Sequence, residues 1–177
     1  MGIEALKVLV QPPKTPLETG GLQEWRAAEK RINLELPTDY RDFILAYGTG
    51  LFARFYGVYN PFSKNEYVNL ELSLKRACDA QREIKAQFPN EVPYLIYPER
   101  PGLLPWGRDD NGNDYFWLTD GPPDSWKVVS CENRGEGFRE YGRTMTEFLC
   151  EVLTRKIEAL AGDYPTDEDR VFEPLTQ

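Results

Sequence analysis

The chain has 177 residues, 41% of them hydrophobic and 13% aromatic, which suffices for the core of one domain, and its 29 acidic and 21 basic residues give a net charge of −8. Nucleic acids and anionic membranes are bound by basic surfaces, so the acidic balance argues against both and favours a basic protein as partner. The absence of histidine excludes Ser-His-Asp and Cys-His catalysis and most zinc sites.

Residues 1–20 are expected to form an N-terminal arm that leads into the domain. Leu6–Val10 is a short run typical of a β-strand. The prolines at positions 12, 13 and 16 then favour a stiff, extended segment, because proline fixes φ and has no N–H to donate.

Three amphipathic helices are predicted, over residues 22–33, 38–48 and 73–88. Apolar residues recur at helical spacing: Leu22, Trp25, Ala28 and Ile32 in the first, Tyr40, Phe43, Ile44 and Tyr47 in the second, and Leu74, Ala77, Cys78, Ile84 and Phe88 in the third. Thr38 is placed to cap the second helix, and Gly48 is suited to end it because glycine readily takes positive φ.

Strands are predicted mainly within residues 50–70 and 94–141. Leu103–Arg108 and Asp114–Leu118 form a hairpin, joined by the turn at 109–113. Both faces of the second hairpin strand are apolar, so we expect it to lie centrally in the sheet. Two further strands are predicted after it: Trp126–Cys131 and Phe138–Tyr141.

A capping box of Thr144 and Glu147 opens the last predicted helix, from residue 145 to about 161. Its apolar face contains Met145, Phe148, Leu149, Val152, Leu153 and Leu160. We expect Phe148, and Phe43 of the second helix, to be buried anchors of the core. The acidic residues 163–177, with two prolines, are expected to form a loosely held tail.

Three cysteines, Cys78, Cys131 and Cys150, form an odd number without a CxxC motif. This pattern predicts free thiols in a reducing compartment. Cys150 points about 120° away from the centre of the apolar stripe on the last predicted helix, at 100° per residue, so it is expected to be the least buried of the three. The first residues lack the basic and apolar regions of a signal peptide, and no apolar run approaches the roughly 18 residues of a membrane helix, so we expect a cytoplasmic protein.

The hairpin turn is the candidate partner-binding site. It places Asp109, Asp110 and Asp114 at one loop, with Trp106 and Tyr115 nearby in sequence. Carboxylates beside aromatic anchors suit a basic protein target. The alternative is purely structural, since Asp and Asn populate hairpin turns for backbone reasons and tryptophans mostly occupy cores.

No catalytic residue, metal site or cofactor is predicted. The acidic turn resembles a calcium loop, but counted from Asp109 it has Gly112 at position four and Asp120 at position twelve, where an EF-hand needs Gly at six and Glu at twelve. The other carboxylates have no spacing typical of paired acid and base groups, and no cysteine has a recognisable base.

Several of these segments together resemble the SUKH superfamily, whose familiar members are the Smi/Knr-like proteins. Its opening is similar to residues 22–29, to Leu36-Pro37-Thr38-Asp39-Tyr40-Arg41-Asp42-Phe43-Ile44 and to Tyr47-Gly48. Later similar positions are Leu104-Pro105-Trp106-Gly107, Asp109, Gly112, Tyr115, Leu118, Trp126, Phe138 and Thr144–Leu153. The sequence departs from many members in Gly48-Thr49-Gly50, where they have adjacent glycines, and in its acidic tail.

The resemblance implies a single α+β domain over residues 21–162, with helices packed on a curved, mainly antiparallel sheet. It implies no enzymatic activity. Bacterial members are mostly immunity proteins that bind and neutralise a cognate toxin domain, and many such toxins are nucleases with a basic substrate groove. Fungal members act instead in cell-wall assembly and signalling. We therefore expect an immunity protein that occludes a basic toxin domain, with a regulatory or scaffold protein as the alternative.

Overall fold

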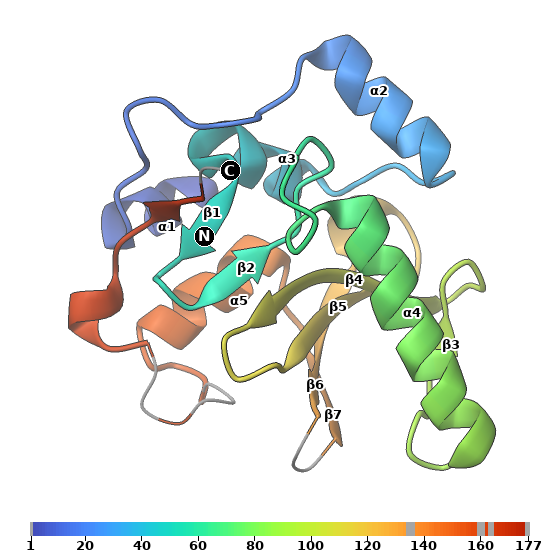
Figure 1. The fold of residues 1–177 in the computed structure, drawn as a ribbon. Coiled ribbons are helices and arrows are strands. Elements are labelled where there is room, and N and C mark those ends of the chain that lie inside the picture. Colours follow the sequence, from blue (N-terminus) through green and yellow to red (C-terminus); the bar gives the residue numbers. More distant parts are fainter. Residues whose placement is uncertain (1, 134–136, 159–161, 163–164, 176–177) are drawn as a thin grey trace.

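The structure is a computed structural model that describes residues 2–133, 137–158, 162 and 165–175. Across these residues, five α-helices pack against one open, eight-stranded sheet, which confirms the predicted α+β class (Figure 1). The helices are α1 (Ile3–Leu9), α2 (Leu22–Arg31), α3 (Thr38–Tyr47), α4 (Leu70–Gln87) and α5 (Met145–Leu153), with 3-10 turns η1 (Pro123–Ser125) and η2 (Asp167–Asp169). The strands are β1 (Gly50–Phe52), β2 (Tyr56–Val58), β3 (Leu95–Ile96), β4 (Gly102–Asp109), β5 (Asp114–Leu118), β6 (Lys127–Glu132), β7 (Gly137–Tyr141) and β8 (Glu173–Pro174).

The strands follow the order β7-β6-β5-β4-β2-β1-β8, and every neighbouring pair on this path is antiparallel. The short β3 pairs in parallel with the start of β4. The β4–β5 hairpin has the predicted turn, with Gly112 at a φ of 85°. β5 lies between β4 and β6, which confirms the predicted central position, and side chains on both of its faces are covered.

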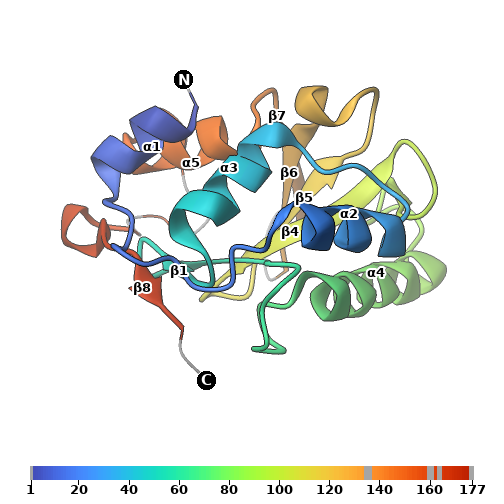
Figure 2. The same ribbon diagram turned by 90° about the horizontal axis from the view of Figure 1, so that it is seen from above.

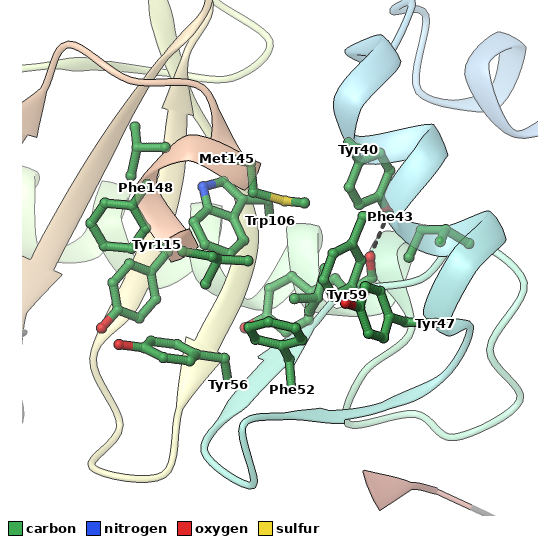
Figure 3. Packing of buried hydrophobic residues seen from close by; sticks show 14 of the residues in the cluster. Tyr40, Phe43, Tyr47, Phe52, Tyr56, Tyr59, Trp106, Tyr115, Met145 and Phe148 are labelled. Carbon is green, nitrogen blue, oxygen red and sulfur yellow. Dashed lines mark hydrogen bonds between the residues drawn. The ribbon is translucent and has the colours of Figure 1, made fainter. Parts of the chain in front are cut away.

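Helices cover both faces of the sheet (Figure 2). On one face, α1, α3 and α5 contact one another over an aromatic core in which Phe43 and Phe148 are buried, as predicted (Figure 3). On the other face, α4 crosses β4, and the buried residues form two smaller clusters. One contains Phe116 and the other contains Cys78.

Helix α3 confirms the predicted stripe, since the four residues of that stripe are fully buried: Tyr40, Phe43, Ile44 and Tyr47. The helix ends at Gly48, whose φ is 72°. A Cβ at this position would lie 2.1 Å from the carbonyl oxygen of Leu17, so both the backbone angle and the close approach require glycine. Thr38 is the first helical residue and not the predicted cap, because its N–H donates to the Asp124 carboxylate instead.

Helices α2 and α4 form where they were predicted, with two exceptions on their apolar faces. Leu22 is 67% exposed, because it is the first residue of α2 and Trp25 fills the site against the core. Phe88 is 54% exposed, because it follows the last turn of α4. Helix α4 begins three residues earlier than predicted, since Asn69 accepts a hydrogen bond from the Leu72 N–H and caps it.

The prediction of a β-like run at Leu6–Val10 is wrong, because residues 3–9 form helix α1. Leu6 and Val10 are four residues apart and both fully buried, and the Val10 carbonyl accepts a hydrogen bond from the Tyr47 hydroxyl at 2.6 Å. The segment that resembled an arm is therefore packed on α3 and α5. A short apolar run fits either a strand or one helix face, and the docking site decides between them.

The last helix is shorter than predicted. The Thr144 N–H does donate to Glu147, but α5 ends at Leu153 and Arg155 has a φ of 55°. Leu160, placed on its apolar face by the sequence, lies outside the described residues, as does Asp163 at the start of the expected tail. Further on, the chain is held in the fold and is not a loose tail: β8 pairs with β1 and Phe172 is buried.

All three cysteines are free and buried. The expectation that Cys150 is the least buried is wrong, because it is 2% exposed, compared with 6% for Cys131. Helix α1 packs against α5. Cys150 is therefore buried even though its position on α5 is rotated away from the apolar stripe.

Candidate binding groove

The hairpin turn is organised by Asp109, which is buried. Its Oδ1 accepts the Asn113 N–H at 2.9 Å, and its Oδ2 accepts the Asn113 side-chain amide at 3.0 Å and the Tyr115 hydroxyl at 2.8 Å. These bonds close the turn and tie it to β5. In this structure the Asp109 carboxylate therefore has a structural role, which was the alternative that the sequence left open.

The two aromatic candidates also lie below the surface. Trp106 is 0% and Tyr115 1% exposed, and both rings pack around Phe148 of α5 (Figure 3). They are core residues that a partner cannot reach here, which corrects the expectation of surface anchors. Asp110 is the one hairpin candidate with an exposed side chain, and partial desolvation and the negative charge of Asp109 raise the pKa of its carboxyl.

Asp114 differs from Asp109 because it faces a groove. The Asn133 side-chain amide donates to its Oδ2 at 2.8 Å, and the Arg108 Nε lies 3.7 Å from its Oδ1. Burial raises the pKa of the Asp114 carboxyl, although Asn133 and Arg108 oppose the rise. A carboxylate that is desolvated and incompletely paired gains from a further donor.

The groove runs between α4 and the β4–β6 side of the sheet and consists of two adjoining hollows of about 580 and 540 Å³. Gln81, Ile84 and Asn133 line both hollows. Other residues lining the larger hollow include Tyr59, Tyr67, Ser73, Arg76, Arg108 and Asp114. Residues lining the smaller one include Asn90, Glu91, Val92, Cys131, Glu132 and Phe138.

Gln81 is the groove residue that the sequence analysis missed. It is 2% exposed, and its Oε1 has no hydrogen-bond partner in the structure. A buried acceptor without a donor is uncommon and costs folding free energy. A signal was present in the sequence, because Gln81 is the polar residue on the apolar stripe of the third predicted helix, between Cys78 and Ile84.

Tyr67 and Arg76 form one wall of the larger hollow. Tyr67 is 70% exposed, and the Arg76 guanidinium lies 6.0 Å from the centre of its ring. The Nη2 of Arg76 donates to the Glu66 carbonyl at 2.9 Å and to the Ser73 hydroxyl at 3.0 Å. This wall therefore combines the ring of Tyr67 with the guanidinium of Arg76, whose hydrogen bonds go to neighbouring protein groups.

The cysteines are not placed for nucleophilic chemistry. Burial raises the pKa of Cys131 to about 12 and those of Cys78 and Cys150 to about 11. Thiols with these pKa values stay protonated at neutral pH and are weak nucleophiles. Within the described residues, no group of three or more Cys, Asp or Glu side chains is arranged to hold a metal ion.

Residues 22–149 match the sequence profile of the SUKH_6 family, described as SMI1-KNR4 cell-wall. The chain belongs to this family. The match spans more than two thirds of the sequence and contains the whole groove, including Gln81, Asp114 and Asn133. It leaves out α1 and β8. No curated protein and no solved structure matches the chain. No helix in the described part of the chain is long and apolar enough to cross a membrane.

Proposed function

We propose that this protein is a cytoplasmic immunity protein that binds a cognate toxin domain and neutralises it by occlusion. The family match over residues 22–149 carries the proposal. Bacterial members of the SUKH superfamily, which the sequence resembles, are mostly toxin-neutralising proteins. The net charge of −8 supports a basic target. Half of that charge comes from residues 163–177, which contain five acidic residues and one basic residue.

The proposed mode of action is binding without catalysis. Domains of this family are generally non-catalytic, and the chain has no histidine to act as a general base. The burial that raises the pKa of its thiols also argues against a covalent mechanism. Neutralisation would then depend on affinity and on which toxin surface is covered.

The direct test is co-expression with a candidate toxin domain, chosen from the genes that neighbour the gene for this protein. We expect growth of cells that express the toxin to be restored, and an inactive toxin variant to co-elute with the protein as a stable complex. Association should slow as salt concentration rises, because opposite net charges steer the encounter. Continued toxicity together with no complex would contradict the proposal.

Asp110 remains a proposed contact for this partner, because its side chain is exposed on the hairpin. Asp110→Lys should slow association with the inactive toxin at low salt while leaving folding unchanged. An unaltered rate would place the partner's surface elsewhere on the protein.

A regulatory or scaffold role is the second candidate, and the family's description as a cell-wall family favours it. The two proposals differ in what deletion of the gene does. An immunity gene should be dispensable when the toxin gene is deleted with it, whereas a cell-wall regulator should leave a growth or cell-shape defect in that double deletion.

A further inference from the structure

We propose that the larger hollow of the groove accepts an arginine side chain of a protein partner, with Asp114 and Gln81 as the acceptors of its guanidinium N–H groups. The inference deepens the proposed function, since the partner would be the toxin domain. The inference depends on a series of side-chain hydrogen bonds, which determines which acceptors in the groove can take a further donor.

That chain begins at Asp114 and ends at Gln81. Because a carboxylate only accepts, Asn133 turns its NH₂ group toward Asp114 and its oxygen away. That oxygen accepts the Cys131 thiol hydrogen at 3.5 Å. The sulfur then accepts from the Gln81 Nε2 at 3.9 Å, which leaves the Gln81 Oε1 as the unpaired end.

Both ends of the chain can therefore accept a further hydrogen bond. The Gln81 Oε1 has no donor, and Gln81 lines both hollows although it is only 2% exposed. We therefore expect its amide to turn outward when a ligand binds. The Asp114 carboxylate has only the Asn133 bond, because 3.7 Å to the Arg108 Nε is too long for a hydrogen bond. A guanidinium carries five N–H groups in a planar fork and fits two such acceptors.

The cations already in the groove do not hydrogen-bond to these two acceptors, although Arg108 forms an ion pair with Asp114 at 3.7 Å. Arg108 donates through Nε and Nη2 to the Gly112 carbonyl, at 3.2 and 3.1 Å, and Arg76 is bonded to Glu66 and Ser73. Tyr67 is 70% exposed even though the Arg76 guanidinium lies 6.0 Å from the centre of its ring, and arginine packs against an aromatic ring better than lysine does. This combination favours arginine as the occupant.

The test is an NMR titration of the ¹⁵N-labelled full chain with N-acetyl-arginine methylamide. We expect saturable shifts at the Gln81 and Asn133 side-chain amides and at the Asp114 backbone, and none of these with the norleucine or glutamate analogues. No saturable shift in the groove, or an equal response to the glutamate analogue, would overturn the inference.

Variants make the test specific. Asp114→Asn should weaken binding of the arginine analogue by about tenfold, whereas Asp110→Asn, in the same turn, should leave it unchanged. Gln81→Leu should weaken binding without lowering the melting temperature, because it removes an unpaired buried oxygen. Arg108→Gln should strengthen binding of the arginine analogue by relieving repulsion, whereas weaker binding of the analogue in this variant would contradict the inference.

The outcome can be separated from that of the proposed function. If the wild-type protein neutralises the toxin and the Asp114→Asn and Gln81→Leu variants do so with equal affinity, the groove is not the docking site and the inference fails alone. If the arginine analogue binds in the groove while the toxin is not neutralised, the site stands and the proposed function fails.

Discussion

The carboxylate of Asp39, in the first turn of α3, caps α5 through Thr146. Asp39 Oδ2 accepts the Thr146 backbone N–H at 2.9 Å and its hydroxyl at 3.0 Å. α3 is capped in the same way, since the Asp124 carboxylate accepts the N–H and the hydroxyl of Thr38 at 2.6 and 3.0 Å. Each helix start is thus satisfied by a side chain distant in sequence, which ties α3, α5 and η1 together.

Replacing Asp39 should loosen this connection. We expect Asp39→Ala to lower the free energy of unfolding by about 1–2 kcal/mol, because α5 loses both a hydrogen-bonded cap and a favourable charge at its N-terminus. Urea unfolding measures the change. Asp42→Ala, on the same helix, is the matched control, and equal losses in the two variants would show that the cap contributes little.

Helix α1 should contribute to stability as a part of the core. Leu6→Ala is expected to cost about 2–5 kcal/mol, because Leu6 is fully buried between helices. Val8→Ala should cost almost nothing, since Val8 is 86% exposed on the same helix. Thermal unfolding of the pair distinguishes a packed helix from an arm, for which neither substitution would matter.

The aromatic core should depend on its two helix anchors. Phe43→Ala and Phe148→Ala should each lower the free energy of unfolding by about 3–5 kcal/mol, through lost burial and the cavity left behind. Leu45→Ala is a suitable control because Leu45 is 51% exposed on α3. A loss below about 1 kcal/mol for either phenylalanine would contradict the packing in Figure 3.

The thiols give the protein a defined response to alkaline pH. In the unfolded chain they ionise near 9, whereas in the folded protein burial raises the pKa of Cys78 to about 11. A raised folded pKa means that this stabilisation is complete below pH 9 and is lost as pH rises toward 11.

We therefore expect the free energy of unfolding to fall between pH 9 and 11, with a shallower fall in Cys78→Ala. At pH 8 a thiol reagent should label none of the three cysteines in the native protein and all three in urea. Rapid labelling of the native protein would show that the thiols are less buried than the structure indicates.

The sequence predicted the elements whose signals are local. The apolar stripe of α3 lies within three turns, and the β4–β5 turn depends on Asp109, Gly112 and their neighbours. Periodicity and turn chemistry act between residues a few positions apart, so they can be read without knowing what else packs nearby. The family resemblance rested on the same segments.

The tertiary structure decided the rest. Whether Leu6–Val10 is a strand or a helix depended on the surface of α5 that receives it, and β8 formed because β1 offered an unpaired edge. Trp106 and Tyr115 are core residues because α5 covers them. The groove needed α4, the hairpin and β6 to bring Gln81, Asp114 and Asn133 together. Whether a side chain is buried, and whether a buried acceptor finds a hydrogen-bond donor, depends on contacts between residues far apart in the chain. Neither can therefore be predicted from the local sequence.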